Sequence, residues 1–126
     1  MGQINNYKEL KVWQKAMDLS ESIYRLTRGF PKNEQYGIIS QIQRSVSSIA
    51  ANIAEGWGRG MTKEYILFLR IARGSLTELE THLILAHRLG YVEREELNRT
   101  QGEIEKIGMM LNGLIQSLKK YVGKRS

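Results

Sequence analysis

The strongest constraint on the fold is the stretch from Thr62 to Leu89, which carries apolar residues along two faces of one predicted helix. On the main face they recur at alternating steps of four and three residues, as on one side of an amphipathic helix. At 100° per residue, a second set falls on nearly the opposite side. Such a helix needs packing partners on both sides. The main face is Tyr65, Leu69, Ala72, Leu76, Leu79, Leu83 and Ala86, and the second face is Leu67, Ile71, Gly74, Leu85 and Leu89.

The length of the chain limits how those partners can be supplied. With 126 residues, the chain can build one core of three or four helices, but it cannot surround a long helix completely. We therefore expect a single domain, residues 1–126, that self-associates through the second face. The predicted interface residues are Leu67, Ile71, Gly74 and Leu85, together with small-residue positions elsewhere.

Two segments before the long helix also have helical periodicity. Residues 9–28 are followed by a Gly-Phe-Pro run, which ends a helix. Residues 33–56 begin with Asn33 as the expected N-cap and end at a glycine-rich turn. The predicted apolar faces are Leu10, Trp13, Met17, Ser20, Ile23, Tyr24 and Thr27 in the first segment, and Ile39, Ile42, Val46, Ile49 and Ile53 in the second.

The long helix, residues 62–89 with Thr62 as its expected N-cap, is followed by a last helical segment, residues 93–122. The acidic first turn of this segment suits the positive end of a helix dipole. Three glycines inside it each lower helix propensity by about 1 kcal/mol, which indicates close packing against neighbours. The apolar face is Leu97, Ile104, Ile107, Leu111, Leu114, Leu118 and Tyr121, and the glycines are Gly102, Gly108 and Gly113.

Four helical segments, short connections and the lack of an alternating strand pattern together predict an all-α fold. The simplest arrangement is an antiparallel up-down-up-down four-helix bundle. No stretch approaches about 20 uncharged apolar residues, and the first ten residues lack the apolar run of a secretion signal. We therefore expect a soluble cytoplasmic protein that does not enter membranes.

Residues that commonly catalyse reactions or bind metals are scarce. The chain has no cysteine, and its only aspartate and histidines are Asp18, His82 and His87. The histidines are five residues apart, so they do not share a helical face as ligands at i and i+4 would. The turn at Gly56–Gly60 lacks the preceding strand and the further fixed positions of a phosphate-binding loop. We expect no enzyme activity, no catalytic or metal-binding residues and no cofactor.

The charges of the chain concentrate at one end of the predicted bundle. Nineteen Lys and Arg against thirteen Asp and Glu give a net charge of +6. An antiparallel bundle brings together the start of its first helix, its second turn and the tail of its last helix. The carboxylates at that end are Glu9, Glu55 and Glu64. The cations, which form the predicted nucleic-acid-binding set, are Lys8, Lys11, Lys15, Arg59, Lys63, Lys119, Lys120, Lys124 and Arg125.

Four segments of the chain carry a family resemblance. They are Tyr7–Ala16 (YKELKVWQKA), Ser48–Arg59 (SIAANIAEGWGR), Glu64–Glu80 (EYILFLRIARGSLTELE) and Leu89–Tyr91 (LGY). They resemble the four-helix-bundle family named after proteins encoded in intervening sequences of 23S ribosomal RNA genes. The resemblance implies a homopentamer with no assigned enzymatic activity. The family is also similar to the accessory protein of diversity-generating retroelements, a basic pentameric barrel that binds nucleic acid and partners a reverse transcriptase.

Two functions fit this sequence. One is a non-enzymatic accessory module that binds RNA or DNA through phosphate contacts at its basic end, because a basic rim repeated around a ring of subunits attracts polyanions. The alternative is a protein-interaction scaffold whose basic end is a solvated surface that complements the helix dipole. Trp13, Trp57 and Tyr65 could stack on bases, but all lie on or beside apolar faces, which favours core packing.

Overall fold

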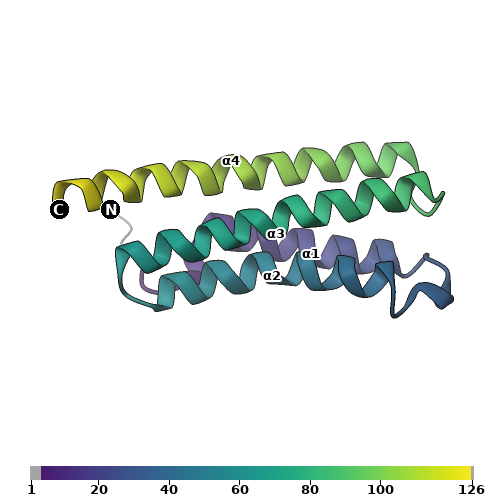
Figure 1. The fold of residues 1–126 in the computed structure, drawn as a ribbon, viewed down its shortest axis with the longest axis horizontal. Coiled ribbons are helices and arrows are strands. Elements are labelled where there is room, and N and C mark those ends of the chain that lie inside the picture. The colour runs from purple at the N-terminus through teal and green to yellow at the C-terminus, as the bar shows by residue number, and fades with distance from the viewer. Residues whose placement is uncertain (1–3, 126) are drawn as a thin grey trace.

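The protein is all-helical in the computed structural model, which describes residues 4–125, with side chains up to residue 122. Its four long helices run in alternating directions, so that the turn between the second and third lies beside the start of the first and the end of the fourth (Figure 1). No strand occurs within residues 4–125. The elements are η1 (Tyr7–Glu9), α1 (Lys11–Thr27), η2 (Lys32–Glu34), α2 (Ile38–Gly58), α3 (Thr62–Arg88) and α4 (Arg94–Arg125).

Each helix packs against the two helices beside it in the bundle. Within the described residues, the backbones of the diagonal pairs, α1 with α3 and α2 with α4, do not approach each other closely. The α2–α3 pair has the most extensive contact, and the α1–α4 pair has the least. One apolar core joins all four helices. Its largest fully buried side chains are Leu19, Ile23, Ile42, Val46, Ile49, Ile53, Leu69, Leu79, Leu83, Leu111 and Ile115. No helix within residues 4–125 combines the length and apolar content that crossing a bilayer requires.

The two faces of α3 have different environments. On the main face every predicted position is buried except Tyr65, which is half-buried, so this prediction is confirmed. On the second face, Leu67, Ile71, Leu85 and Leu89 remain 43–52% exposed. The chain therefore covers one apolar face of α3 with its own helices and leaves the opposite one uncovered.

Several predicted helix boundaries are wrong by a few residues. The second helix begins at Ile38, and Asn33 lies in η2 instead of capping α2; its N-cap is Gly37. Residues 33–37 include no buried side chain, so no core contact draws them into the helix. Thr62 is the first residue of α3, whose N-cap is Met61. The first and fourth helices begin at 11 and 94, α2 ends at 58, α3 at 88 and α4 at 125.

The predicted inner face of the first helix is wrong at two positions. Met17 and Tyr24 are 40% and 42% exposed, whereas Ile23 and Thr27 of the same predicted face are buried. The neighbouring positions Val12, Ala16 and Leu19 also recur at helical steps, and the other helices cover these positions instead. In α4, Tyr121 is 49% exposed and the buried Ile115 was missed. The buried line of α1 is Val12, Ala16, Leu19, Ile23 and Thr27.

Glycine at position 56 allows α2 and α3 to approach closely. A Cβ built there would lie 2.7 Å from Cβ of Phe68 and 3.2 Å from the backbone oxygen of Tyr65. The close contact predicted for the α4 glycines is not found within the chain at Gly102 or Gly113, where a Cβ would meet nothing within 4 Å. Gly108 alone has a neighbour on α3, at an ordinary 3.6 Å.

The side chain of Tyr65 fills the space beside this contact. Its hydroxyl is buried and has no hydrogen-bond partner among the described residues, and burial raises the pKa of Tyr65 to about 12. Trp13 packs against the core and meets the ring of Tyr7 edge-on, with ring centroids 5.4 Å apart. Tyr65 and Trp13 therefore serve packing, as the sequence predicts.

Replacing Gly56 with alanine is expected to destabilise the fold, although alanine is the better helix former. The new methyl group would overlap backbone and Cβ atoms, which cannot swing away, at a cost of about 1–3 kcal/mol. The same change at Gly102, also within a helix but facing open space, should stabilise by up to about 1 kcal/mol. Urea unfolding of both variants measures the difference. Equal stabilisation by the two substitutions would contradict a close α2–α3 contact at Gly56.

Candidate nucleic-acid interface

The fold brings the predicted cations to one end of the bundle. Lys8 lies in η1, Lys11 and Lys15 begin α1, and Lys119 and Lys120 lie near the end of α4. The α2–α3 turn lies at the same end of the molecule (Figure 1); it carries Arg59, and Lys63 follows in the first turn of α3. The side chains of Lys124 and Arg125 lie outside the described residues. Residues far apart in sequence therefore contribute charge to a common end.

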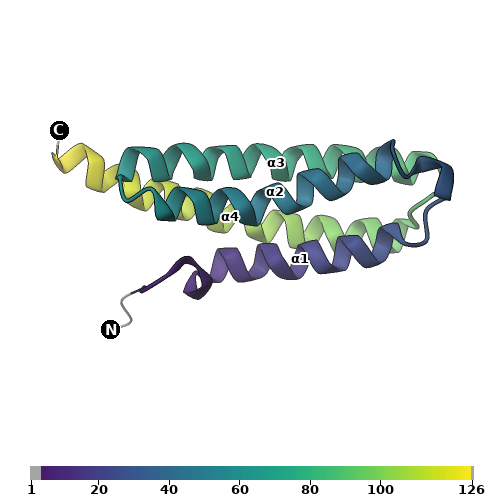
Figure 2. The same cartoon turned by 90° about the horizontal axis from the view of Figure 1, so that it is seen from below.

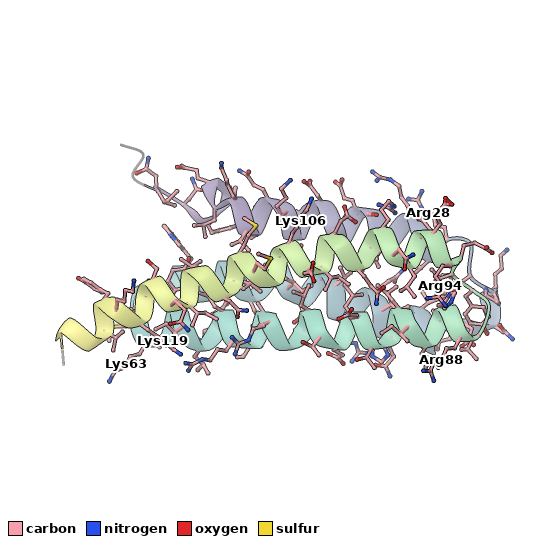
Figure 3. All side chains as sticks on the ribbon, turned by 90° about the horizontal axis from the view of Figure 1, so that it is seen from above. Arg28, Lys63, Arg88, Arg94, Lys106 and Lys119 are labelled. Carbon is pink, nitrogen blue, oxygen red and sulfur yellow. The ribbon has the colours of Figure 1, made fainter. Side chains whose placement is uncertain are left out.

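Six lysines of this set are exposed and free of ion pairs among the described residues. Figure 3 shows Lys63, from the start of α3, and Lys119, from the end of α4, close to each other at this end. An exposed ammonium group without a carboxylate partner can contact a phosphate without breaking an existing pair. These lysines are Lys8, Lys11, Lys15, Lys63, Lys119 and Lys120.

Arg59 is different, because its guanidinium already has partners. It pairs with Glu55 at 3.1 Å and with Glu64 at 3.6 Å, and it lies over the ring of Phe68 at 4.9 Å from the centroid. These contacts connect the α2–α3 turn to both of the helices that it joins. Its role is therefore structural in the isolated chain, and the sequence pattern did not reveal the pairing.

The cations of the basic end lie on two sides of the bundle instead of forming one patch. In Figure 2 the start of α1 and the end of α4 lie on opposite sides of the molecule. Glu9, the carboxylate nearest in sequence to Lys8, accepts a hydrogen bond from Asn6 Nδ2 at 3.3 Å. A flat surface would therefore contact either the cations at the start of α1 or those at the end of α4, but not both at once.

The opposite end carries nearly as many carboxylates as cations in the sequence, but their pairing is uneven. Arg99 donates to Glu96 at 2.9 Å and to Glu103 at 3.4 Å, and its hydrogen bond holds the pKa of Glu96 below the ordinary value. Arg28, Arg88 and Arg94, which Figure 3 shows at this end, form no ion pair among the described residues. The net charge of this end, summed from the sequence, therefore does not reveal that three of its arginines are unpaired.

A cavity of about 540 Å³ opens beside Arg28, between α1, η2 and α2. It was not anticipated from the sequence, because Tyr24 was assigned to the core and residues 33–37 to a helix. The signal that could have identified it is the spacing of aromatic and basic residues on both sides of the Gly-Phe-Pro turn. Its lining includes Tyr24, Arg28, Lys32, Tyr36, Gln43 and Arg44.

The two histidines lie apart, and their contacts are structural. His87 donates a hydrogen bond from Nδ1 to the carbonyl oxygen of Val92 at 2.7 Å, which fixes the turn between α3 and α4. Nε2 of His82 is buried, has no hydrogen bond to any residue that the structure describes, and lies 3.8 Å from Oε2 of Glu78. Within the part of the chain that the structure describes, no three His, Cys, Asp or Glu side chains gather as metal ligands would.

Polar side chains between α2 and α3 bond to one another. The hydroxyls of Ser48 and Ser75 are 2.8 Å apart, and Asn52 donates to the Ser48 hydroxyl at 2.9 Å. This chain of bonds satisfies polar groups in the most extensive helix contact of the bundle.

Comparisons with known proteins agree with this architecture. The chain is similar to a protein of unknown function from the S23 ribosomal protein family of Bacteroides thetaiotaomicron VPI-5482. The crystal structure of that protein superposes with a TM-score of 0.76 at 30% identity, covering 82% of this chain and 97% of the other. A comparison with curated proteins finds no match.

The sequence also matches the model of one protein family, described as 23S rRNA-intervening sequence protein, over residues 8–113. The matched region runs from η1 through most of α4 and includes nearly all of the four segments on which the resemblance was based. The chain therefore belongs to the family of 23S rRNA-intervening sequence proteins.

Proposed function

We propose that this protein is a non-enzymatic accessory module that binds RNA or DNA through phosphate contacts at its basic end. The observation that carries the proposal is the set of six exposed lysines at that end, which take part in no ion pair among the described residues. Lysine offers a compact charge without the planar fork that arginine uses to read bases. The expected binding is therefore independent of sequence.

Self-association strengthens this proposal. The uncovered face of α3 carries large apolar side chains that a second copy of the chain would remove from water. A closed ring of copies would repeat the basic end around one rim, so that a single polyanion meets several subunits. The accessory role, and a ring of five, follow the resemblance to the accessory protein of diversity-generating retroelements.

The function is tested by replacing Lys63, Lys119 and Lys120 with glutamine and measuring binding by fluorescence anisotropy at several salt concentrations. The wild-type protein should bind labelled RNA or DNA with a log affinity that falls linearly with log salt. The triple variant should bind more weakly. The slope of its log affinity against log salt should be flatter by about 0.7–0.9 for each phosphate that a replaced lysine neutralises in the wild-type complex.

A matched control is the replacement of Arg88, Arg94 and Arg99 with glutamine, which removes the same charge at the opposite end. This control should keep most of the wild-type salt slope. If both triple variants lose affinity equally, only net charge matters and the basic end is no site. If the wild-type protein does not bind near physiological salt, the scaffold alternative is correct.

The interface is tested by replacing Leu67 and Leu85 with glutamine, because both are about half exposed on the uncovered face of α3. The substitutions should leave the core intact and release a compact monomer of 14.5 kDa. Light scattering at micromolar concentration measures the mass of both proteins. A wild-type protein that is itself monomeric would refute the interface.

A further inference from the structure

The cavity between α1 and α2 combines free cations with aromatic rings, and it lies away from the basic end. Its walls come from the last turns of α1, from η2 and from the first half of α2. The volume of about 540 Å³ falls within the range of small-molecule sites. We name it the α1–α2 cavity.

Three cations line the α1–α2 cavity, and no carboxylate within the described residues does. Arg28, Lys32 and Arg44 are exposed and form no ion pair among the residues that the structure describes. Glu34, which lies close to Lys32 in η2, accepts a hydrogen bond from the hydroxyl of Tyr91 at 2.7 Å. The cavity therefore favours an anion, and two arginines provide the paired donors that bind phosphate well.

Two tyrosines supply flat surfaces at the same cavity. Tyr36 is 95% exposed and Tyr24 is 42% exposed, so folding of the chain gives the ring of Tyr36 almost no burial. An aromatic ring beside a positively charged groove is the recurrent arrangement for stacking an unpaired base. The ring of Tyr36 has no other use that the fold reveals.

Side-chain hydrogen bonds hold the polar lining of the cavity in place. Gln43 donates through Nε2 to the hydroxyl of Thr27 at 3.1 Å, and Thr27 donates to the carbonyl oxygen of Tyr24 at 3.1 Å. The amide oxygen of Gln43 and its second N–H remain available to a ligand. An oriented amide can bond to the edge of a base.

We propose that the α1–α2 cavity binds one unpaired nucleotide of a single strand, with its phosphate against Arg28 and Arg44 and its base stacked on Tyr36. A base inside a duplex is already stacked and paired, so it must first leave its stack and its partner before it can enter the cavity. The cavity therefore gives the protein a preference for single-stranded over duplex nucleic acid. This preference does not depend on the lysines of the basic end.

The test replaces Tyr36, whose exposure makes misfolding a minor concern. Tyr36→Ala should weaken binding of a short labelled single strand roughly 5- to 100-fold, as expected for the loss of one stacked base. Binding of the matching duplex should stay unchanged. The salt slope should also stay unchanged, because stacking releases no counterions. Tyr36→Phe, which keeps the ring, should bind like the wild-type protein, and Tyr36→Leu should resemble the alanine variant.

The two arginines give an independent measurement. Replacing Arg28 and Arg44 with glutamine should weaken single-strand binding and flatten its salt slope by about 0.7 for each phosphate that a replaced arginine neutralises. Adenosine 5′-monophosphate should compete with the labelled strand better than inorganic phosphate does, since only the nucleotide offers a base. Equal competition by the two compounds would overturn the proposal.

Other outcomes would also refute the site. Tyr36→Ala could bind the single strand as tightly as the wild-type protein, or lose strand and duplex equally. A changed mass in light scattering would show that the cavity is instead a contact between copies of the chain. Loss of binding only in the lysine triple variant would support the basic end and reject the cavity. Loss of binding only in the Tyr36→Ala variant would support the cavity and reject the basic end.

Discussion

The close packing of α2 on α3 is the contact on which the rest of the structure depends. It requires a glycine at position 56, where a Cβ would lie 2.7 Å from Phe68. The turn that follows is fastened by Arg59 between two carboxylates. This geometry presents the start of α3 beside the end of α4, where Lys63 and Lys119 lie close together (Figure 3). The position of the basic end is therefore a consequence of core packing.

Helical periodicity was a good guide to α2, to the main face of α3 and to most of α4, where the predicted positions are buried or half-buried. It was wrong for two positions of α1, since Met17 and Tyr24 are exposed while the buried line passes through Leu19. Apolar residues recur at helical spacing on both lines, and only the positions of the other three helices determine which line is buried. Boundaries failed where a short 3₁₀ turn replaces the helix, as at Asn33.

The candidate site was only partly predictable for a related reason. Summing charges over the ends of a bundle locates the six free lysines, because antiparallel topology alone brings them together. The same sum treats Arg59 as free, although it is paired, and treats Arg28, Arg88 and Arg94 as neutralised, although they form no ion pair among the described residues. Pairing depends on side-chain distances of a few ångströms, which no sequence count contains. The cavity beside Arg28 was missed because Tyr24 was assigned to the core.

The central claim is that unpaired cations at one end of the bundle contact phosphates. Lysine acetylation followed by mass spectrometry measures it directly, with and without saturating nucleic acid. Lys106, exposed near the middle of α4, is the internal control (Figure 3). We predict that bound nucleic acid protects Lys63, Lys119 and Lys120 from acetylation while Lys106 reacts as before. Equal reactivity of all four lysines in the presence and absence of nucleic acid would contradict the account.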